Sequence, residues 1–234
     1  PVTPVVGDLR FNSSLTQYEG FSGGVWGAIG GAAGALTIDD LTDGYSVAES
    51  IGLGIGALAN ITTGTGTKNS AVGNNALYAN TDGDFNSAMG YYSLFANTTG
   101  NSNSAVGAYA LVSNTTGAYN SAVGNGALYA NTDGDYNAAM GIEALYSNTD
   151  GDNNVAIGAY SLWSNTTGYR NSAMGTSALG VNTTGYLNSA MGVDALWSNT
   201  TGYSNSAMGA NALVSNTTGK WNSAMGVEAL NRNT

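Results

Sequence analysis

The chain contains neither cysteine nor histidine among its 234 residues. Without cysteine there is no disulfide framework and no thiolate to act as a nucleophile or a ligand. The absence of histidine removes the side chain that most often serves as a general base or a transition-metal ligand near neutral pH. The carboxylates that remain form no recognisable nucleophile–base pair, so we expect that the protein is not an enzyme.

Basic residues are almost as scarce. The chain has five of them against 15 acidic residues, which gives a net charge of -10. They are Arg10, Lys68, Arg170, Lys220 and Arg232, and they form no patch along the sequence. We therefore expect neither nucleic-acid binding nor a polybasic membrane contact. No stretch of 18 apolar residues is present, so we also expect no membrane insertion.

Charged residues make up only 9% of the chain, far below the roughly 25% of an average soluble domain. Glycine, with 35 residues, and small polar residues take their place. Such a composition is compatible with disorder. A strict repeat with invariant apolar positions argues against disorder here.

The repeat is the motif Asn-Ser-Ala-Met/Val-Gly, which occurs ten times with close variants and always at the same 17-residue interval. Its asparagines are Asn69, Asn86, Asn103, Asn120, Asn137, Asn154, Asn171, Asn188, Asn205 and Asn222. A constant period without insertions indicates a solenoid, in which each repeat is one coil stacked on the previous one.

The consensus of one coil is Asn-Ser-Ala-Met/Val-Gly-x-x-Ala-Leu-x-x-Asn-Thr-Thr/Asp-Gly-x-x. Two glycines and an Asn-Thr-Thr-Gly cluster in every coil would interrupt a helix. We predict an all-β parallel β-solenoid, or β-roll, with two short strands per coil and turns at Gly73 and at Asn80–Gly83. The glycines are expected at positive φ or at tight inner corners. Ten coils at the spacing of β-strands would form a rod of roughly 50 Å.

The sequence divides into three regions. Residues 1–34 are not repetitive and predict a small β-hairpin or β-meander attachment module. Residues 35–68 predict a linker and an atypical capping coil, with two extra residues before Lys68. Residues 69–234 hold the ten 17-residue repeats. The chain starts at Pro1 and stops inside a repeat, so we expect it to be a piece of a longer polypeptide.

Two apolar pairs recur in every coil, such as Ala71-Val72 and Ala76-Leu77. Neighbours on a strand point to opposite faces, so one member of each pair is expected to point outward. Ten coils would then carry an apolar stripe larger than a monomer usually exposes. A parallel copy of the same chain presents the matching stripe, which predicts cyclic homo-oligomers, although periodicity alone does not separate a dimer from a trimer.

The segment from Asn69 to Leu77 resembles the head repeats of YadA-like trimeric adhesins, except that its coil is longer. The stretches Gly7–Asn12, Tyr18–Phe21 and Trp26–Gly31 are similar to a module common in bacteriophage tail-fibre and virion fibre proteins. These resemblances imply a homotrimeric β-roll that serves as a fibre shaft in a phage virion. They also imply that the N-terminal module binds other virion proteins and that the device contacts a host surface glycan or protein. The alternative is a bacterial surface adhesin stalk.

Three coils contain Asn-Thr-Asp-Gly-Asp, in which alternating oxygen ligands are typical of Ca²⁺ sites. The carboxylates in question are Asp82, Asp84, Asp133, Asp135, Asp150 and Asp152. The distal glutamate of an EF-hand is missing, and an acidic Asx-type turn is the alternative interpretation. Apart from this possible calcium we expect no cofactor.

Two further features repeat with the coil. A threonine pair such as Thr98-Thr99 could match an ice surface, although the following glycine indicates a turn.

Aromatic residues gather after the leucine, as at Tyr78, and near the loop glycine, as at Phe85. Exposed rings could stack on sugars, and packing between neighbouring coils is the other interpretation.

Overall fold

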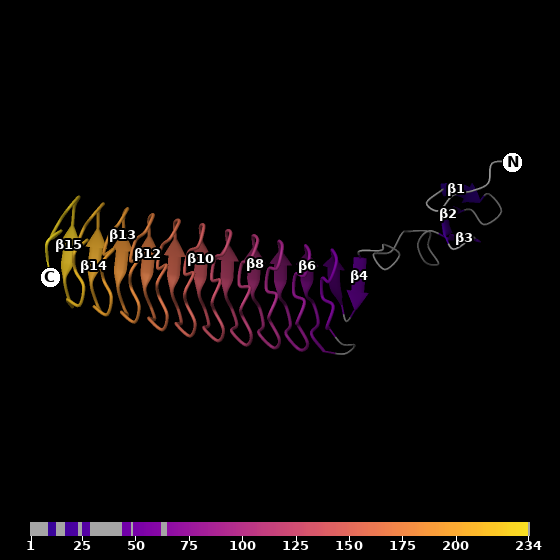
Figure 1. The fold of residues 1–234 in the computed structure, drawn as a ribbon, viewed down its shortest axis with the longest axis horizontal. Coiled ribbons are helices and arrows are strands. Elements are labelled where there is room, and N and C mark those ends of the chain that lie inside the picture. The colour runs from indigo at the N-terminus through magenta and orange to yellow at the C-terminus, as the bar shows by residue number, and fades with distance from the viewer. Residues whose placement is uncertain are drawn as a thin grey trace. The chain divides into compact units, whose positions relative to one another are not determined.

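The computed structural model describes residues 9–12, 17–22, 25–28, 44–47, 49–61 and 65–233. This part of the chain forms strands and turns without any helix, so no described helix could cross a membrane. The chain divides into two compact units, Pro1–Ser46 and Val47–Thr234 (Figure 1).

The first unit contains a three-stranded antiparallel sheet. Its strands β1 (Leu9–Asn12), β2 (Gln17–Ser22) and β3 (Val25–Ala28) are hydrogen-bonded in the order β1-β2-β3. Each strand therefore pairs with its neighbour in sequence, as in a meander. The predicted small β-module at the N-terminus is confirmed.

The second sheet has twelve strands in the order β15 to β4, where β4 is Gly44–Val47 and β5 is Ser50–Leu53. The strands of the repeats are β6 (Ser70–Val72), β7 (Ser87–Met89), β8 (Ser104–Val106), β9 (Ser121–Val123), β10 (Ala138–Met140), β11 (Val155–Ile157), β12 (Ser172–Met174), β13 (Ser189–Met191), β14 (Ser206–Met208) and β15 (Ser223–Met225). From β5 to β15 every pairing is parallel. The β-solenoid predicted from the period is confirmed, and Figure 1 shows its coils stacked in sequence order.

The register follows the repeat. Ala71 pairs with Ala88, which holds the same position in the next repeat of the sequence. Between β5 and β6 the partners are Gly52 and Ala71, whose separation along the chain is two residues longer than one repeat. The two extra residues that the sequence places before Lys68 thus belong to the atypical first coil.

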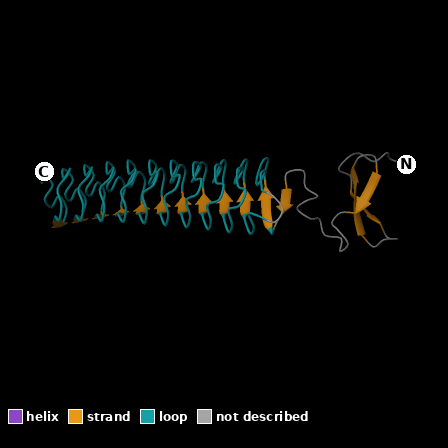
Figure 2. Ribbon diagram, turned by 90° about the horizontal axis from the view of Figure 1, so that it is seen from below, coloured by secondary structure: helices purple, strands orange, loops and turns teal. Residues whose placement is uncertain are grey.

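Each of the ten repeats has one strand of three residues, so the prediction of two strands per coil was wrong. The second segment, around Ala76-Leu77, is a turn. Its residues still bond to the next coil, because the Leu77 amide donates to the Ser93 carbonyl at 3.0 Å. Figure 2 shows the strands along one edge of the solenoid and turns over the rest of each coil.

The leucine of each repeat explains this difference. Leu77 has a φ of 51°, in the left-handed region, and the leucines at the same place in the other coils have φ values of 50–54°. Side chains do not alternate through such a turn. Ala76 and Leu77 are therefore both fully buried, and the expectation that one of them points outward was wrong.

The first apolar pair behaves as the strand pattern predicts. Ala71 is fully buried, while Val72 and Ser70 on either side of it face outward. In the nine repeats that begin at Asn69 to Asn205, the lumen is thus filled by two small residues and one leucine, together with two asparagines. Such a narrow core leaves no room for a second large side chain from the strand.

Candidate functional site

The outward face of the strands carries two columns of side chains. One column is mainly serine, and the other, which we call the strand stripe, is apolar. The strand stripe consists of Val72, Met89, Val106, Val123, Met140, Ile157, Met174, Met191, Met208 and Met225. Its members are between 36% (Val72) and 79% (Met225) exposed. The predicted outward apolar stripe is confirmed for this pair, and it runs along all ten repeats.

Two ladders of buried asparagine side chains line the lumen. In the first, the backbone N–H of Asn86 donates to the side-chain Oδ1 of Asn69 at 2.8 Å, and Asn86 Nδ2 donates to the Gly100 carbonyl at 2.8 Å. In the second, Asn97 Nδ2 donates to Asn80 Oδ1 at 2.7 Å. No buried side-chain N or O atom among the described residues lacks a hydrogen-bond partner. The ladders hold each coil to the next from inside.

Sequence reasoning missed these ladders. The sequence predicted only a turn at Asn80–Gly83, whereas the side chains of Asn80 and of its equivalents up to Asn216 are fully buried. The signal was present, because an asparagine that never varies is unusual for a plain turn. Because the Asn side chain carries both a hydrogen-bond donor and an acceptor, asparagines stacked at the coil spacing can each donate to one neighbour and accept from the other along the whole stack.

The aspartates proposed for calcium lie at the corner after the second asparagine. Asp82, Asp133, Asp150 and Asp152 are exposed, while Asp84 and Asp135 are half-buried. No group of three or more acidic side chains that could hold a metal gathers among the described residues. Whether calcium binds stays a prediction.

Three of these carboxylates bond to the preceding coil. Asp84 Oδ1 accepts from the Thr67 amide at 2.6 Å, and Asp135 Oδ1 accepts from the Ala118 amide at 2.7 Å. Asp152 Oδ1 accepts from the Asp135 amide at 2.8 Å. In this arrangement the carboxylates at these positions satisfy backbone donors that would otherwise face solvent.

The threonine pairs lie at the same corner. The first residue of each pair donates its hydroxyl to the next coil, as Thr98 Oγ1 does to the Thr115 carbonyl at 3.1 Å. The second, such as Thr99, is exposed. One outward threonine per coil on a turn provides no flat double row, so the geometry does not favour ice binding.

Aromatic side chains stack from coil to coil, which confirms packing between coils. The ring centroids of Tyr129 and Tyr146 lie 4.8 Å apart, and the two ring planes make an angle of 15°. The ring centroids of Tyr119 and Tyr136 also lie 4.8 Å apart, with an angle of 3° between the planes. The spacing matches that of the coils. Burial raises the pKa of Tyr146, and the neighbouring Tyr129 and Glu143 raise it further.

The aromatic column after the leucine is interrupted by smaller or polar residues, at Val112 and, toward the C-terminal end, at Gly180, Val214 and Asn231. We call this the ring column, and it contains Tyr78, Phe95, Val112, Tyr129, Tyr146, Trp163, Gly180, Trp197, Val214 and Asn231. At Gly180 it leaves a hollow of about 330 Å³ between Trp163 and Trp197. A second hollow of about 350 Å³ lies against Trp197 and includes Val214 in its lining.

Comparison of the chain with protein-family models, with curated proteins and with solved structures gives no match. The geometry of the solenoid is therefore the basis for its proposed function.

Proposed function

We propose that this chain is a shaft segment of a fibre in a phage virion, where it holds or forms part of a host-attachment device. The role is mechanical and involves no catalysis. The observation that carries the proposal is the strand stripe, an unbroken exposed apolar surface on a regular stack of coils. A stack of ten 17-residue repeats at strand spacing is about 48 Å long and held by hydrogen bonds at every step.

The strand stripe supports association of parallel copies into a homotrimer. It lies on the strand face, where Met140 and Met174 are 54% and 41% exposed. Large exposed apolar patches in otherwise polar surfaces mark protein interfaces. A parallel copy would present the same residues at the same spacing, so every coil would add one contact layer. The resemblance to trimeric adhesin repeats supports three copies.

Charge placed on the stripe should prevent this association. For the double variant Met140→Lys and Met174→Lys, we expect sedimentation at the mass of one chain, and for the unaltered protein we expect sedimentation at the mass of three chains. The reason is that buried unpaired ammonium groups oppose association strongly. Analytical ultracentrifugation measures the masses, and circular dichroism checks that the fold is kept.

The matched control is the double variant Thr167→Lys and Thr184→Lys, which adds the same charge at exposed corner positions. It should remain trimeric. Because the chain carries a net charge of -10, two added lysines also lower the repulsion between copies, so loss of assembly in the stripe variant cannot be a net-charge effect. A monomeric unaltered protein, or a stripe variant that stays trimeric, would contradict the proposal.

The virion role and the N-terminal module are tested by the surrounding genes. We expect neighbouring genes to encode tail or capsid proteins, and the N-terminal module of residues 1–34 to bind one of them. A bacterial surface adhesin stalk is the second candidate, because the repeat from Asn69 to Leu77 resembles adhesin head repeats. An encoded segment that anchors the same polypeptide to a bacterial surface would favour the adhesin over the virion fibre.

A further inference from the structure

The hollow at Gly180 arises because two neighbouring columns become small in the same coil. Beside the ring column runs the turn column, which contains Asn75, Tyr92, Tyr109, Gly126, Glu143, Tyr160, Ser177, Asp194, Asn211 and Glu228. In two other coils one column is small and the other fills the space: Tyr109 accompanies Val112, and Tyr129 accompanies Gly126. The coil of Asn211 and Val214 has no ring in either column, and the second hollow lies there. In the coil of Ser177 and Gly180 both side chains are small, and the surface opens.

The walls of this hollow are aromatic. Trp163 and Trp197 belong to the coils on either side of Gly180 and are 40% and 44% exposed, and Tyr160 contributes a third ring. Trp163 is held in place, because its Nε1 donates to Glu143 Oε2 at 2.9 Å. Trp197 leans toward the glycine, since a Cβ at Gly180 would lie 3.1 Å from its Cδ1. The hollow is thus one ring position of a stacked column with its ring missing.

The size and chemistry of the space define the ligand. A volume of about 330 Å³ lies at the lower end of the range for small-molecule pockets, roughly 300–1,000 Å³. Flat, amphipathic indole faces suit a ligand with one apolar face and a polar edge. The carboxylate of Glu143 accepts hydrogen bonds, and hydroxyl groups donate them. A pyranose ring has this combination of an apolar C–H face and hydroxyl donors.

Charge selects among sugars. Among the described residues that line the hollow, Glu143 is acidic and none is basic, and the chain carries a net charge of -10. A sugar acid would meet repulsion without a compensating cation. The second hollow, on which Trp197 and Asp194 border, could accept the next residue of the same glycan.

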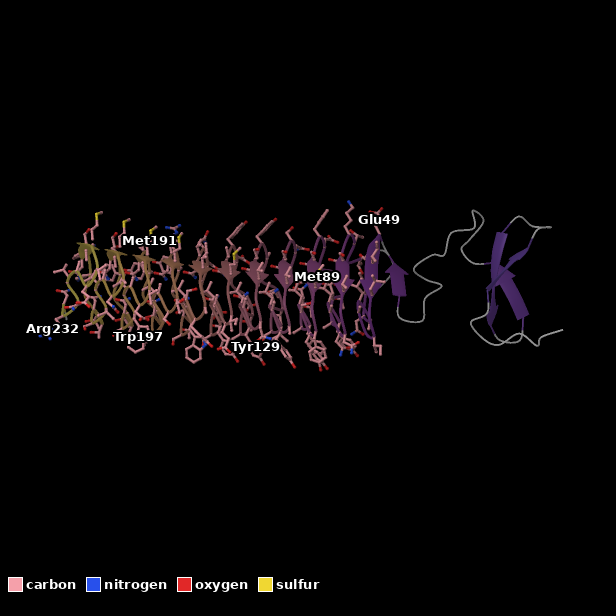
Figure 3. All side chains as sticks on the ribbon, turned by 90° about the horizontal axis from the view of Figure 1, so that it is seen from above. Glu49, Met89, Tyr129, Met191, Trp197 and Arg232 are labelled. Carbon is pink, nitrogen blue, oxygen red and sulfur yellow. The ribbon has the colours of Figure 1, made fainter. Side chains whose placement is uncertain are left out.

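We propose that the hollow at Gly180 is a binding site for one ring of a neutral glycan, held between Trp163 and Trp197. The site lies away from the strand stripe: Figure 3 shows Met191 and Trp197 at opposite edges of the solenoid. Association through the stripe therefore leaves the hollow open. The proposal depends on residues of a single chain and stands whether or not the fibre role is correct.

The experiment uses the full chain labelled with 5-fluorotryptophan and observed by fluorine NMR. The probes are the methyl pyranosides of glucose, galactose and mannose, with glucuronic acid as the charged counterpart and cyclohexanol as an apolar ring that lacks the sugar hydroxyl pattern. We expect at least one pyranoside to shift the Trp163 and Trp197 signals with millimolar affinity. Glucuronic acid and cyclohexanol should bind at least about tenfold more weakly.

Three variants locate the site. Trp197→Ala removes one of the two indole rings that border the hollow. Gly180→Tyr places a tyrosine in the ring column, where other coils already carry tyrosine. Both should lose binding by about tenfold or more. Trp221→Ala is the matched control, because Trp221 is exposed and contacts Tyr203 edge-on, away from the hollow.

Each outcome decides the matter. Binding that disappears in Gly180→Tyr but persists in Trp221→Ala supports the site, and Gly180→Tyr keeps the test valid if the tryptophan variant misfolds. The proposal is overturned if no pyranoside binds, if cyclohexanol binds as well as the sugars, or if Gly180→Tyr binds like the unaltered protein.

Discussion

The variant Gly124→Ala is expected to destabilise the solenoid by more than about 3 kcal/mol. Gly124 follows strand β9 and has a φ of 141°, a conformation that residues with a Cβ rarely adopt. A Cβ there would overlap the carbonyl group of Gly141 in the next coil, with the carbonyl carbon only 2.7 Å away. Because that obstacle is backbone, the coils would have to separate, and the ladder hydrogen bonds around the substitution would weaken.

The control lies two residues further along the same turn. Gly126 has a φ of 64°, but a Cβ there would meet its nearest atom, Glu143 Cγ, at an ordinary 3.4 Å. Asn75 already occupies the same position in another coil with a φ of 55°. Gly126→Asn should therefore change the free energy of unfolding by less than about 0.5 kcal/mol.

Urea unfolding followed by circular dichroism measures both variants against the unaltered protein. Hydrogen exchange at the amides of β9 and β10 would show whether the damage is local, as expected when each coil contacts only its neighbours. Equal stability of the two variants would mean that the close approach of Gly124 to Gly141 does not limit the coil spacing.

The sequence was sufficient to predict the stacking of coils, because an unbroken 17-residue period is typical of solenoids and of few other architectures. It was also sufficient for the strand that contains Ala71 and Val72, because neighbours on a strand point to opposite faces and the pair is buried and exposed accordingly. The glycine after each strand was expected at positive φ or at a tight corner. Gly73 meets both conditions, with a φ of 135° and the backbone of Gly90 beside it.

The second half of each coil could not be predicted in the same way. Leucine carries no sequence signal for a positive φ, and the left-handed region costs such a residue about 1–2 kcal/mol. Leu77 adopts it because the turn lets both Ala76 and Leu77 enter the lumen. Burial of a leucine contributes about 1.5–3 kcal/mol, which is enough to offset the strain. The local backbone preference of leucine alone would predict a negative φ at this position.

The hollow at Gly180 was missed for a different reason. The repeat pattern describes the residues that the coils share, whereas the hollow depends on two residues in which one coil differs from the others. In that coil Ser177 and Gly180 are both small, although they belong to neighbouring columns. Positions that repeat in every coil build the scaffold. The coil in which neighbouring columns both change is where a solenoid acquires a surface unlike its other coils.

The second large effect is expected inside the lumen, at Asn131. Its Nδ2 donates to Asn114 Oδ1 at 2.8 Å and to the Gly134 carbonyl at 3.0 Å, and its Oδ1 accepts from Asn148 Nδ2 at 2.8 Å. Asn131→Ala leaves Asn114 Oδ1 buried without a donor and removes one partner of Asn148. We expect a loss of about 2–4 kcal/mol in the free energy of unfolding.

Asn131→Asp is nearly isosteric and separates hydrogen bonding from packing. An ionised carboxylate would face two acceptors, Asn114 Oδ1 and the Gly134 carbonyl, inside a buried ladder, so at pH 7 this variant should be less stable than Asn131→Ala. Protonation restores a donor. The pKa of the new carboxyl should therefore be raised in the folded state, and the destabilisation should shrink as the pH falls through that raised pKa.

The comparison needs two references, because the other acidic residues also titrate. Each variant is measured by urea unfolding between pH 7 and pH 4, and its free energy is subtracted from that of the unaltered protein at the same pH. Asn125→Ala, at an exposed asparagine in the preceding turn of the same coil, serves as the control and should differ by less than about 0.5 kcal/mol at every pH. If Asn131→Asp showed no recovery at low pH, the ladder would owe its stability to side-chain shape, and the continuous chain of donors and acceptors from Asn80 to Asn216 would contribute little to joining the coils.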